Sequence, residues 1–435
     1  MKTAQILKEK FTNHSAKVGI LGLGYVGLPL ACEFAKAGLN VTGFEVDPSK
    51  VKRIRSGKSY IGDIESSQIR DLLKTARLSA TTDFGRLRHM DAIIVCVPTP
   101  LNKTKDPDIS FIDEATRKIA MTLRRGQLIV LESTSYPGTT REHVLPLLEK
   151  HGLTVGQDFF LAFSPERIDP GNRQYKLPNT PKVVGGITPS CKELSVALYS
   201  QIIKQVVPVS SAEAAELTKL LENTFRAVNI GLVNEIMMIC DKLKLNVWEV
   251  IDAAATKPYG FMPFYPGPGL GGHCIPIDPH YLSWKMKSLN FAARFIDLAE
   301  EVNSHMPDFT VNKILQTLNQ RKKSINGSTI VVLGIAYKAN VSDVRESPAL
   351  DVIHLLRQMG AEVSYHDPYV HSIQVGDHRM TSRPYSKDLL RRADAVVIAT
   401  AHNAFNGRDI LANSRLVIDT RNMLRGVKSD HLVRL

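Results

Sequence analysis

The chain has 435 residues, of which 43% are hydrophobic and 23% are charged. This length exceeds what one hydrophobic core usually organises, so two or three domains are expected, and the composition excludes a fibrous or disordered protein. No apolar run reaches the length of a membrane span, and the polar N-terminal segment lacks the apolar core of a secretory signal. The sequence therefore predicts a cytoplasmic protein.

The formal net charge is +12, but lysine and arginine are scattered along the chain and not interleaved with aromatic residues. The longest basic run, at 321–323, lies beside serine and asparagine, as in a solvated linker. A diffuse positive charge favours anionic small molecules over a nucleic acid or a membrane surface as partners.

The cysteines are odd in number, widely spaced and form no CxxC pair, which argues against disulfides and against a structural zinc site. No metal is expected. Only the last of them lies among glycines, and the other four lie in apolar or helical contexts typical of inert core residues. They are Cys32, Cys96, Cys191, Cys240 and Cys274.

Residues 1–16 form an N-terminal extension that we expect to be at most a short surface helix. A buried strand at 17–23 then runs into the turn GLGYVG, followed by an apolar helix to about residue 37 and a strand at 40–44 that ends at Glu45. Strand, tight turn, helix and strand in this order are the context that a dinucleotide-binding fingerprint requires.

Each glycine of this fingerprint has a physical role. Gly22 permits the turn, Gly24 lets a pyrophosphate approach the backbone, and Gly27 lets the helix pack against the strand. Tyr25 and Val26 open the helix, whose N-terminal N–H groups would face the pyrophosphate. Glu45 is placed to bind the ribose 2′-hydroxyl and would repel a 2′-phosphate, so NAD is favoured over NADP.

The strand and helix alternation continues to about residue 209. Buried strands are predicted at 91–97, 127–131 and 159–163, with two more at 182–184 and 205–207, in an open parallel sheet. Ligands bind beyond the carboxyl ends of such strands. Three polar residues follow these ends and are candidates for ligand contact, namely Thr99, Thr134 and Glu166.

A long helix is predicted from about 211 to 244, because apolar residues recur there at helical spacing without proline. Helices of this length usually bridge domains or subunits. Lys219 and Asn223 are four residues apart, so they lie on the same face of this helix. The region 210–312 is expected to be a mostly helical middle domain.

A second α/β pattern occupies 313–435. Strands are predicted at 328–338, 361–365, 395–399 and 416–419, with a helix that starts at Pro348 and has Ser347 as its N-cap. No glycine fingerprint follows Gly334. We therefore expect a Rossmann-like domain that binds something other than the first cofactor.

The segment GPGLGGHCIPIDP, at 267–279, combines glycines for close backbone approach with prolines that stiffen the loop. Its polar side chains are His273, Cys274 and Asp278. This pattern is typical of a nucleophile beside an acid/base partner. The alternative is a stiff surface turn that happens to contain a buried cysteine.

Several motifs together resemble the UDP-glucose/GDP-mannose dehydrogenase family, from about Lys17 onward: GLGYVGLPLA, FEVD, CVPTP, ESTSYPGTT, SPER, GPGLGGHCIPIDP and GIAYKANVSDVRESPA. The resemblance implies an α/β fold in which two Rossmann-like domains are joined by a long central helix and a helical dimerisation region. It also implies NAD as cofactor, a UDP-sugar as substrate, and a homodimer or higher homo-oligomer.

The reaction that the resemblance implies is a four-electron oxidation of the sugar C6 alcohol to a carboxylate, whose product feeds surface polysaccharide biosynthesis. A cysteine thiolate adds to the aldehyde formed first, and the adduct is oxidised to a thioester that water hydrolyses.

The resemblance assigns roles to particular residues. Cys274 matches the nucleophile, Lys219 the cation that stabilises oxyanion charge and depresses the thiol pKa, and Asn223 a hydrogen-bond donor beside it. Asp278 matches the carboxylate that orders water or acts as base. Glu166 and Thr134 match groups around that water and the substrate.

Further residues are implied to hold the ligands. In addition to the fingerprint, Thr99, Thr134 and Arg345 are expected to contact NAD. For the substrate, the resemblance adds Arg167, Gly271, Lys338 and Arg421 to Glu166, Lys219 and Asn223.

Departures from the UDP-glucose dehydrogenase pattern favour an N-acetylated sugar. His273 stands where those enzymes usually have serine, residues 167–171 replace their usual continuation after SPE, and 257–260 lack their upstream arginine. UDP-N-acetyl-D-glucosamine is the expected substrate. UDP-N-acetylgalactosamine, UDP-N-acetylmannosamine and UDP-glucose are the alternatives.

Two other function classes are alternatives to a catalytic dehydrogenase. A non-catalytic NAD-binding relative would be expected to have lost part of the set formed by Cys274, Lys219, Asn223, Asp278 and Glu166, all of which are present. A UDP-sugar epimerase would usually carry a Tyr-x-x-x-Lys pair near the nicotinamide, and none is expected where the first domain places its active site.

Overall fold

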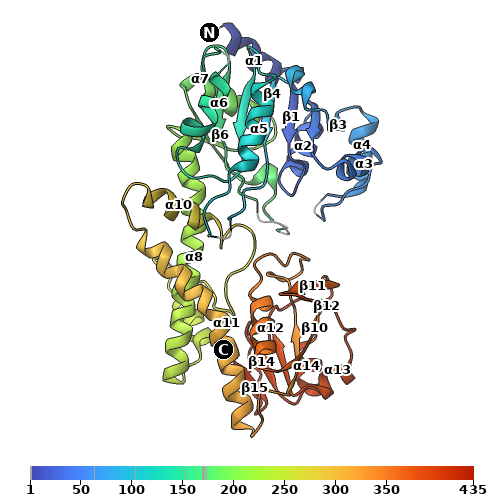
Figure 1. The fold of residues 1–435 in the computed structure, drawn as a ribbon, viewed down its shortest axis with the longest axis vertical. Coiled ribbons are helices and arrows are strands. Elements are labelled where there is room, and N and C mark those ends of the chain that lie inside the picture. The colour runs from blue at the N-terminus through green and yellow to red at the C-terminus, as the bar shows by residue number, and fades with distance from the viewer. Residues whose placement is uncertain (1, 63, 103, 151, 169–171, 173) are drawn as a thin grey trace. The chain divides into compact units, whose positions relative to one another are not determined.

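A computed structural model describes residues 2–62, 64–102, 104–150, 152–168, 172 and 174–435. These residues form two compact units. The first comprises Met1–Glu222 and His280–Phe291, and the second comprises Asn223–Pro279 and Ala292–Leu435. Figure 1 shows a sheet flanked by helices in each of them. The predicted fold class, with two Rossmann-like domains and a long helix, is confirmed.

The first unit is built on an eight-stranded sheet with the order β3-β2-β1-β4-β5-β6-β7-β8. The strands are β1 (Lys17–Leu21), β2 (Asn40–Phe44), β3 (Leu78–Thr81), β4 (Ala92–Val95), β5 (Leu128–Leu131), β6 (Phe160–Phe163), β7 (Lys182–Gly186) and β8 (Val206–Pro208). The predicted strands are confirmed, and β3 is an addition. The expectation of a parallel sheet is wrong for one pairing, because β7 runs antiparallel to β6.

The strands of this sheet are apolar on both faces because helices cover both. Along β4, Ala92 and Ile94 belong to one core cluster, while Ile93 and Val95 belong to the other. The helical elements are α1 (Lys2–Thr12), α2 (Gly27–Lys36), α3 (Pro48–Arg55), α4 (Ser66–Lys74), η1 (Phe84–His89), α5 (Ser110–Ala120), η2 (Thr139–Val144), α6 (Leu145–Glu149), η3 (Leu177–Asn179) and α7 (Pro189–Tyr199).

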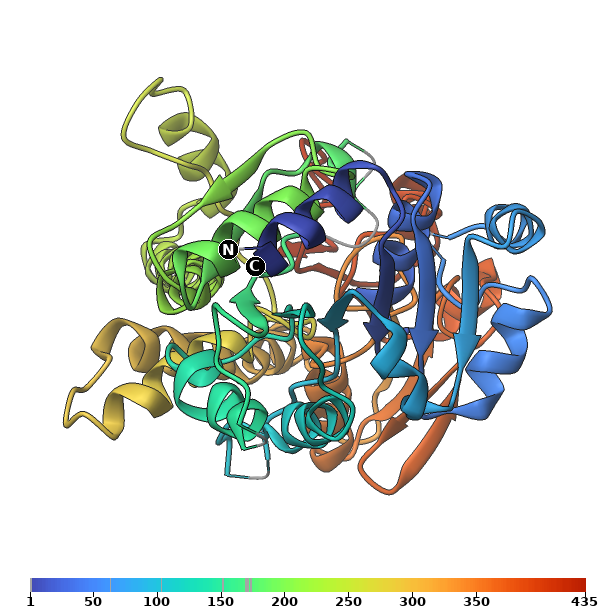
Figure 2. The ribbon, with the colours of Figure 1, turned by 90° about the horizontal axis from the view of Figure 1, so that it is seen from above.

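Helix α1 is more than a surface extension. Its side chains Leu7 and Phe11 are fully buried in the core, and Lys10 forms a 2.8 Å ion pair with Asp91. Figure 2 shows α1 beside α7, against which it packs. The sequence predicted the helix but not its part in the core.

The long helix α8 (Ala212–Leu243) is confirmed, and it contributes residues to both units. In the second unit it packs against α11 (Arg294–Gln320), which continues through Pro307. A Cβ on Gly231 of α8 would lie 3.3 Å from the Cα of Ala299, so glycine allows the close approach of the two helices. The shorter helices of the middle region are α9 (Val247–Ala254) and α10 (Asp278–Lys287).

The second sheet, with the order β10-β9-β13-β14-β15, is parallel throughout. Its strands are β9 (Thr329–Leu333), β10 (Glu362–His366), β13 (Ala395–Ile398), β14 (Val417–Asp419) and β15 (Leu432–Arg434). Around it lie α12 (Pro348–Gln358), α13 (Lys387–Arg392), α14 (Gly407–Asn413) and the hairpin of β11 (Ser372–Val375) and β12 (His378–Thr381).

Ser347 precedes α12 as predicted, but its hydroxyl does not cap the helix. It donates instead to the carbonyl of Ile335 at 2.7 Å. The side chain therefore ties the start of α12 to the segment that follows β9.

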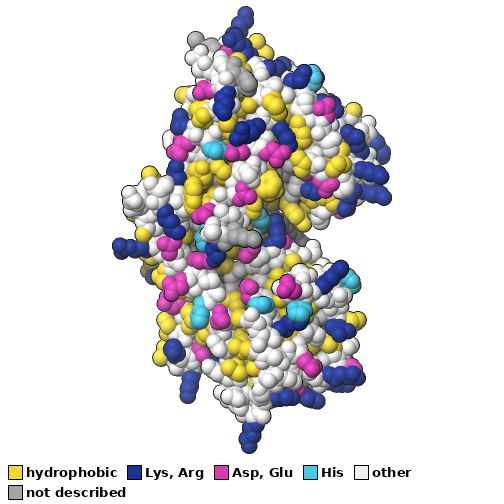
Figure 3. Space-filling model, viewed as in Figure 1, with side chains coloured by type: hydrophobic (Ala, Val, Ile, Leu, Met, Phe, Trp, Pro, Cys, Tyr) yellow, Lys and Arg dark blue, Asp and Glu magenta, His cyan; other side chains and the backbone are white. Residues whose placement is uncertain are grey.

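The face of the molecule seen in Figure 3 carries its positive charge diffusely. Figure 3 shows lysine and arginine spread over the visible face, interspersed with acidic side chains. Among the helices that the structure describes, none combines the length and the apolar character needed to cross a membrane.

Candidate active site

The glycine-rich turn after β1 has the geometry that the fingerprint predicts. Gly22 has a φ of +85°, and a Cβ there would lie 2.4 Å from the carbonyl oxygen of Cys96. A Cβ on Gly27 would lie 1.8 Å from the carbonyl oxygen of Gly22. In contrast, a Cβ on Gly24 would meet nothing within 4 Å. Two glycines are therefore required by the fold, and the third faces open space suited to a pyrophosphate.

Glu45, directly after β2, holds this turn in place. Its carboxylate accepts hydrogen bonds from the N–H of Leu23 at 3.1 Å and of Val46 at 2.9 Å, and Lys50 lies 3.5 Å away. The residue is only 6% exposed. It lies beside the β1–β4 switch point, where the strand order reverses and where doubly wound sheets bind nucleotides.

The remaining predicted cofactor residues of the first unit come shortly after the ends of β1, β4 and β5 in the chain. Tyr25 is exposed, and Val26 precedes α2 as its N-cap residue. Thr99, shortly after β4, is buried, and Thr134, shortly after β5, is half-buried.

Glu166 lies after the carboxyl end of β6 and is held by four groups. Its Oε1 accepts from the N–H of Arg167 and of Ile168, both at 2.7 Å, and Lys182 Nζ lies 3.4 Å from Oε2. Lys219 Nζ donates to the main-chain carbonyl of Glu166 at 2.8 Å. The structure thus brings together Glu166 and Lys219, as predicted.

No sequence motif singles out the buried residues that lie behind Glu166. Lys182 also pairs with Glu132 at 3.1 Å, and Tyr199 donates its hydroxyl to Glu132. Extending the β6–β7 register, which pairs Phe163 with Gly185, puts Lys182 opposite Glu166. In a parallel arrangement Lys182 would start its strand at the other edge, so the strand direction creates this cluster.

The charges of this cluster follow from burial and pairing. Burial opposes ionisation of Glu166, but Lys182, two backbone N–H groups and Lys219 lower its pKa overall. Burial raises the pKa of Glu132, with Lys182 opposing. The pKa of Lys182 is raised because its two carboxylate partners outweigh burial. At neutral pH Glu166 is therefore an anion beside a cation.

Arg167, the residue after Glu166, connects this segment to α8 and to the residue before β7. It pairs with Glu222 of α8 at 2.6 Å and donates to the carbonyl of Pro181 at 2.7 Å. The neighbouring Asp169, Pro170 and Gly171, which belong to the departure from the family pattern, lie outside the described residues.

In the second unit, Cys274 is exposed at a turn that leads into α10. Its carbonyl accepts from the N–H of Ile277 at 3.2 Å and of Asp278 at 2.8 Å. Asp278, 2% exposed, opens α10, and its Oδ2 accepts from Asn223 Nδ2 at 2.5 Å. The predicted nucleophile, acid/base residue and amide thus lie together.

The other cysteines differ in environment. Cys32, Cys191 and Cys240 are buried, and Cys96 is half-buried. Burial raises the pKa of Cys32 to about 12 and that of Cys96 well above its ordinary value. These two thiols are protonated at neutral pH and unreactive, as expected for core residues.

The glycines of the Cys274 loop pack against the segment after β9. A Cβ on Gly271 would lie 2.7 Å from the Cβ of Tyr337, and a Cβ on Gly272 would lie 2.9 Å from its ring. The N–H of Gly272 donates to the carbonyl of Arg345 at 3.0 Å. At least part of the glycine requirement therefore comes from packing within the protein.

The three predicted cations of the C-terminal domain have different surroundings. Lys338 is half-buried in the segment after β9. Arg345 is exposed and forms a 2.6 Å ion pair with Asp343. Arg421 donates to the carbonyl of Ala399 at 3.0 Å, and burial lowers its pKa to about 10.

His273, for which the sequence predicts no role, lies near enough to Asp343 to affect its titration. Burial opposes the charge of Asp343, but Arg345 and, to a lesser extent, His273 lower its pKa overall.

A Tyr-x-x-x-Lys spacing does occur in the first unit, on α10. Tyr281 is fully buried and donates its hydroxyl to the carbonyl of Pro100 at 3.2 Å, while Lys285 forms a 2.7 Å ion pair with Glu142. The hydroxyl and the ammonium group thus have separate partners within the unit, which does not favour the acid/base pair of an epimerase.

Three family models match consecutive parts of the chain. The NAD binding domain of the UDP-glucose/GDP-mannose dehydrogenase family matches residues 16–203, the central domain of that family matches 213–305, and its UDP binding domain matches 331–426.

Relatives match over almost the whole chain. This chain is 33% identical over 422 residues to the UDP-N-acetyl-D-glucosamine 6-dehydrogenase of Pseudomonas aeruginosa, and the match covers 95% of this chain and 98% of that protein. It is 35% identical over 415 residues to the UDP-N-acetyl-D-mannosamine dehydrogenase of Pyrococcus horikoshii, covering 94% and 96%. The solved structure of UDP-D-ManNAc dehydrogenase from Pyrococcus horikoshii matches with a TM-score of 0.88 at 33% identity, covering 96% of this chain and 98% of that one.

The glycine turn after β1 and the exposed cysteine are the features expected of the family that these full-length matches indicate. The chain therefore belongs to the UDP-glucose/GDP-mannose dehydrogenase family and is an NAD-dependent UDP-sugar dehydrogenase.

Proposed function

We propose that the protein oxidises the C6 hydroxyl of UDP-N-acetyl-D-glucosamine to the carboxylate, giving UDP-N-acetylglucosaminuronate. The observation that carries the chemistry is the exposed Cys274 in a turn closed by Asp278, whose carboxylate is held by Asn223. The choice of an N-acetylated sugar is supported by His273 and by the activities named for the relatives. The same chemistry on UDP-N-acetylmannosamine, UDP-N-acetylgalactosamine or UDP-glucose is the alternative.

The oxidation has to proceed in two stages. Loss of a hydride and a proton from the C6 alcohol gives an aldehyde, to which the Cys274 thiolate adds, forming a thiohemiacetal. Loss of a second hydride, together with the hydroxyl proton, gives a thioester, and water cleaves it to the carboxylate and the free thiol. NAD, when bound, accepts one hydride in each oxidation, so two NADH form per sugar.

The residues that we propose for the cofactor suit it physically. Gly24 leaves room for a pyrophosphate, and the first N–H groups of α2 supply partial positive charge for it. Glu45 is proposed to bind the adenosine ribose, with Tyr25, Val26, Thr99 and Thr134 lining the site. Arg345 is proposed as a further contact.

The acid/base roles follow from charge. Lys219 is proposed to stabilise oxyanion charge, and Asp278 to order or deprotonate the hydrolytic water with Asn223 beside it. Glu166, an anion held by Lys182, is suited to accept a hydrogen bond or a proton. Thr134, Arg167, Gly271, Lys338 and Arg421 are proposed to position the substrate.

We further infer a homodimer or higher homo-oligomer, because large apolar side chains on one face of α8 are exposed, among them Leu232 and Ile239. Since NAD and UDP-activated sugars are cytoplasmic metabolites, we place the reaction in the cytoplasm. A UDP-activated uronic acid is a glycosyl donor, which fits a role in surface polysaccharide biosynthesis.

The substrate is tested by measuring NADH formation with the four UDP-sugars named above. We expect the highest kcat/KM with UDP-N-acetyl-D-glucosamine and two NADH per sugar consumed. A higher kcat/KM with another sugar of the panel would replace the proposed substrate. No NADH with any of them would instead favour a non-catalytic relative.

The nucleophile is tested with Cys274→Ala and the matched control Cys240→Ala, which removes a buried thiol elsewhere. Loss of an essential nucleophile is expected to lower carboxylate formation by roughly a thousandfold or more. The control variant should stay near the wild-type rate. Full-rate carboxylate formation by Cys274→Ala would exclude the thioester route.

A further inference from the structure

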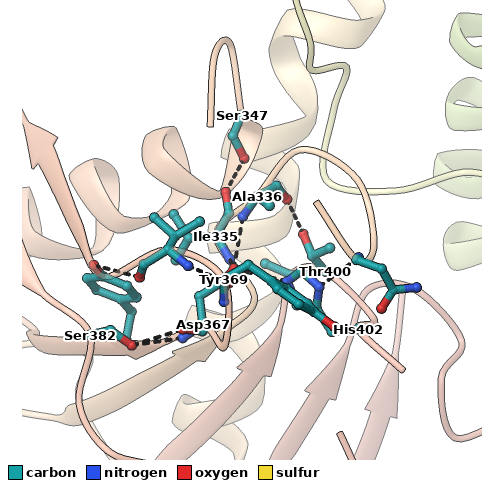
Figure 4. A network of polar contacts seen from close by, with 12 residues as sticks. Ile335, Ala336, Ser347, Asp367, Tyr369, Ser382, Thr400 and His402 are labelled. Atoms are coloured by element: carbon teal, nitrogen blue, oxygen red, sulfur yellow. Dashed lines mark hydrogen bonds and ion pairs between the residues drawn. The ribbon is translucent and has the colours of Figure 1, made fainter. Parts of the chain in front are cut away.

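The segment from Ile335 to Asn340, which follows β9 and carries Lys338, is tied to a buried acid–base pair (Figure 4). Asp367 follows β10 as Glu45 follows β2, and it accepts from the N–H groups of Ile335 and Ala336 at 2.6 and 3.1 Å. His402 Nε2 lies 3.0 Å from the same carboxylate oxygen, and both side chains are fully buried.

The hydrogen-bond partners fix the tautomer of His402. Its Nδ1 lies 2.9 Å from the main-chain nitrogen of Asn340, which can only donate. Nδ1 therefore carries no proton, and the neutral ring has its proton on Nε2, from which it donates to Asp367. One imidazole thus links the carboxylate to the far end of the segment.

Asn340 completes the link. Its backbone is left-handed, with φ at +63°, and its side-chain oxygen accepts from the N–H of Asn403 at 2.9 Å. Asn340 and the 402–403 pair thus exchange two hydrogen bonds. Thr400 adds a bond to the carbonyl of Ala336 at 2.6 Å. The segment is held at both ends.

Asp367 has little capacity left for a ligand. Its second oxygen accepts from the N–H groups of Tyr369 at 2.8 Å and Val370 at 3.1 Å, in addition to the bonds described above. In a dinucleotide-binding domain an acid at this position receives ribose hydroxyls. Like Glu45, Asp367 accepts from backbone N–H groups of its own domain, and it has the buried His402 as an additional partner.

The segment also forms the surface against which the Cys274 loop packs. Tyr337, the residue before Lys338, contacts Gly271 and Gly272. A displacement of the segment would therefore move both a proposed substrate-binding lysine and the support of the loop that carries the nucleophile.

We propose that His402 and Asp367 are positioning residues that hold the segment from Ile335 to Asn340 in the conformation that binds the sugar nucleotide. The inference rests on the proposed function, in which Lys338 contacts the UDP-sugar. His402 acts through Asn340 and Lys338 and does not itself touch the substrate.

The test measures UDP binding by calorimetry, together with KM for UDP-N-acetyl-D-glucosamine and KM for NAD. For His402→Ala we expect UDP binding to weaken about tenfold, because the segment must then be ordered on binding. KM for the sugar nucleotide should rise in parallel, while KM for NAD changes less than about twofold. Unchanged UDP binding would overturn the proposal.

A second pair of variants does not depend on a buried site. Asn340 is exposed, and glycine tolerates its left-handed backbone, so Asn340→Gly should fold while losing the bond to Asn403. Asn340→Asp keeps the acceptor and is the matched control. We expect weaker UDP binding in Asn340→Gly and near wild-type binding in Asn340→Asp. Equal UDP affinity in the two would contradict the inference.

These measurements separate the two proposals. If no UDP-sugar yields NADH but UDP still binds and His402→Ala weakens it, the proposed reaction fails and the positioning role stands. If the wild type turns over the sugar nucleotide and neither His402→Ala nor Asn340→Gly changes its KM, the positioning role fails.

Discussion

Lys182 lies between two carboxylates, with only 4% of its side chain exposed. Burying an unpaired charge costs several kcal/mol, so this lysine and the carboxylates Glu132 and Glu166 depend on one another. Because Glu166 also receives two backbone N–H groups, its carboxylate is held in one orientation. We expect this pairing to keep Glu166 ionised throughout the pH range of activity.

Replacing Lys182 by methionine should raise the pKa of Glu166, because burial would then act without the opposing cation. The acidic limb of the kcat/KM profile should move to higher pH, with roughly a tenfold loss near neutral pH. Lys182→Arg, which keeps the charge, is the control. The profile is measured with the preferred UDP-sugar. Coincident profiles for wild type and Lys182→Met would separate Lys182 from the titration of Glu166.

Asp367 should make stability depend on pH. Burial opposes its charge, but His402 and several N–H groups lower its pKa overall. A carboxyl group with a lowered folded-state pKa contributes stability above its unfolded pKa, near 3.8, and loses it as the pH falls further. The difference in Tm between wild type and Asp367→Asn should therefore be large near neutral pH and shrink below about pH 3.8.

Thermal unfolding across this pH range checks the expectation. The exposed Asp377 provides a control, since Asp377→Asn should leave Tm nearly unchanged at each pH. A gap between wild type and Asp367→Asn that stays constant with pH would show that the ionised form of Asp367 is not what stabilises the fold.

At the scale of elements, the turn between β1 and α2 separates folding from binding. Gly22 and Gly27 sit where a Cβ would collide with backbone carbonyl oxygens, whereas Gly24 has free space. The first two glycines are therefore needed to form the turn, whereas Gly24 is not needed for folding and is proposed to leave room for the pyrophosphate. Alanine variants of Gly22 and Gly24 should therefore differ in thermal stability and in KM for NAD.

Gly24→Ala should fold with a Tm close to that of the wild type, because nothing lies within 4 Å of the new Cβ. Its KM for NAD should rise by about tenfold or more, because the methyl group occupies the space proposed for the pyrophosphate. Gly22→Ala should lower Tm instead. Unchanged KM for NAD in Gly24→Ala would mean that the pyrophosphate lies elsewhere.

Several short elements are not predicted by the sequence patterns, among them β3, the hairpin of β11 and β12, and β15. The strand β3 and the hairpin of β11 and β12 are four residues each and carry few large apolar side chains. They form because a neighbouring strand offers main-chain partners, as β2 does for β3. Periodicity needs a longer window than four residues, so even the buried Leu78 and Ala80 of β3 do not reveal a strand in the sequence.

At the scale of the whole molecule, α8 presents an apolar surface that the described chain leaves uncovered. Side chains at spacings of four and seven residues lie along one face of the helix and are exposed, namely Leu221, Phe225, Leu232, Ile239 and Leu243. A stripe of this kind is typical of a helix that packs against another subunit.

Leu232→Glu should shift the proposed oligomer toward monomer, because a carboxylate in an apolar interface is costly to desolvate. Light scattering after size-exclusion chromatography measures the mass. Lys52→Glu, a charge change on the exposed part of α3, is the control and should keep the wild-type mass. An unchanged mass for Leu232→Glu would place any subunit contact on another surface.

The sequence by itself determined the class of the protein and singled out the residues that we propose as its reactive groups. Glycine spacing, apolar strands and the cysteine loop depend on short-range rules of backbone freedom and burial, so they can be read without knowing which segments meet. The dinucleotide turn, the long helix and the glycine-rich loop around Cys274 are examples.

Only the tertiary structure decided which charged groups meet. The antiparallel direction of β7 brings Lys182 to Glu166, and the parallel pairing of β9 with β10 and β13 brings Asp367 and His402 to one segment. Strand order and direction are set by the packing of the whole domain, which local patterns do not encode. Because ionisation depends on neighbours distant in sequence, the charge states of these sites follow from the fold.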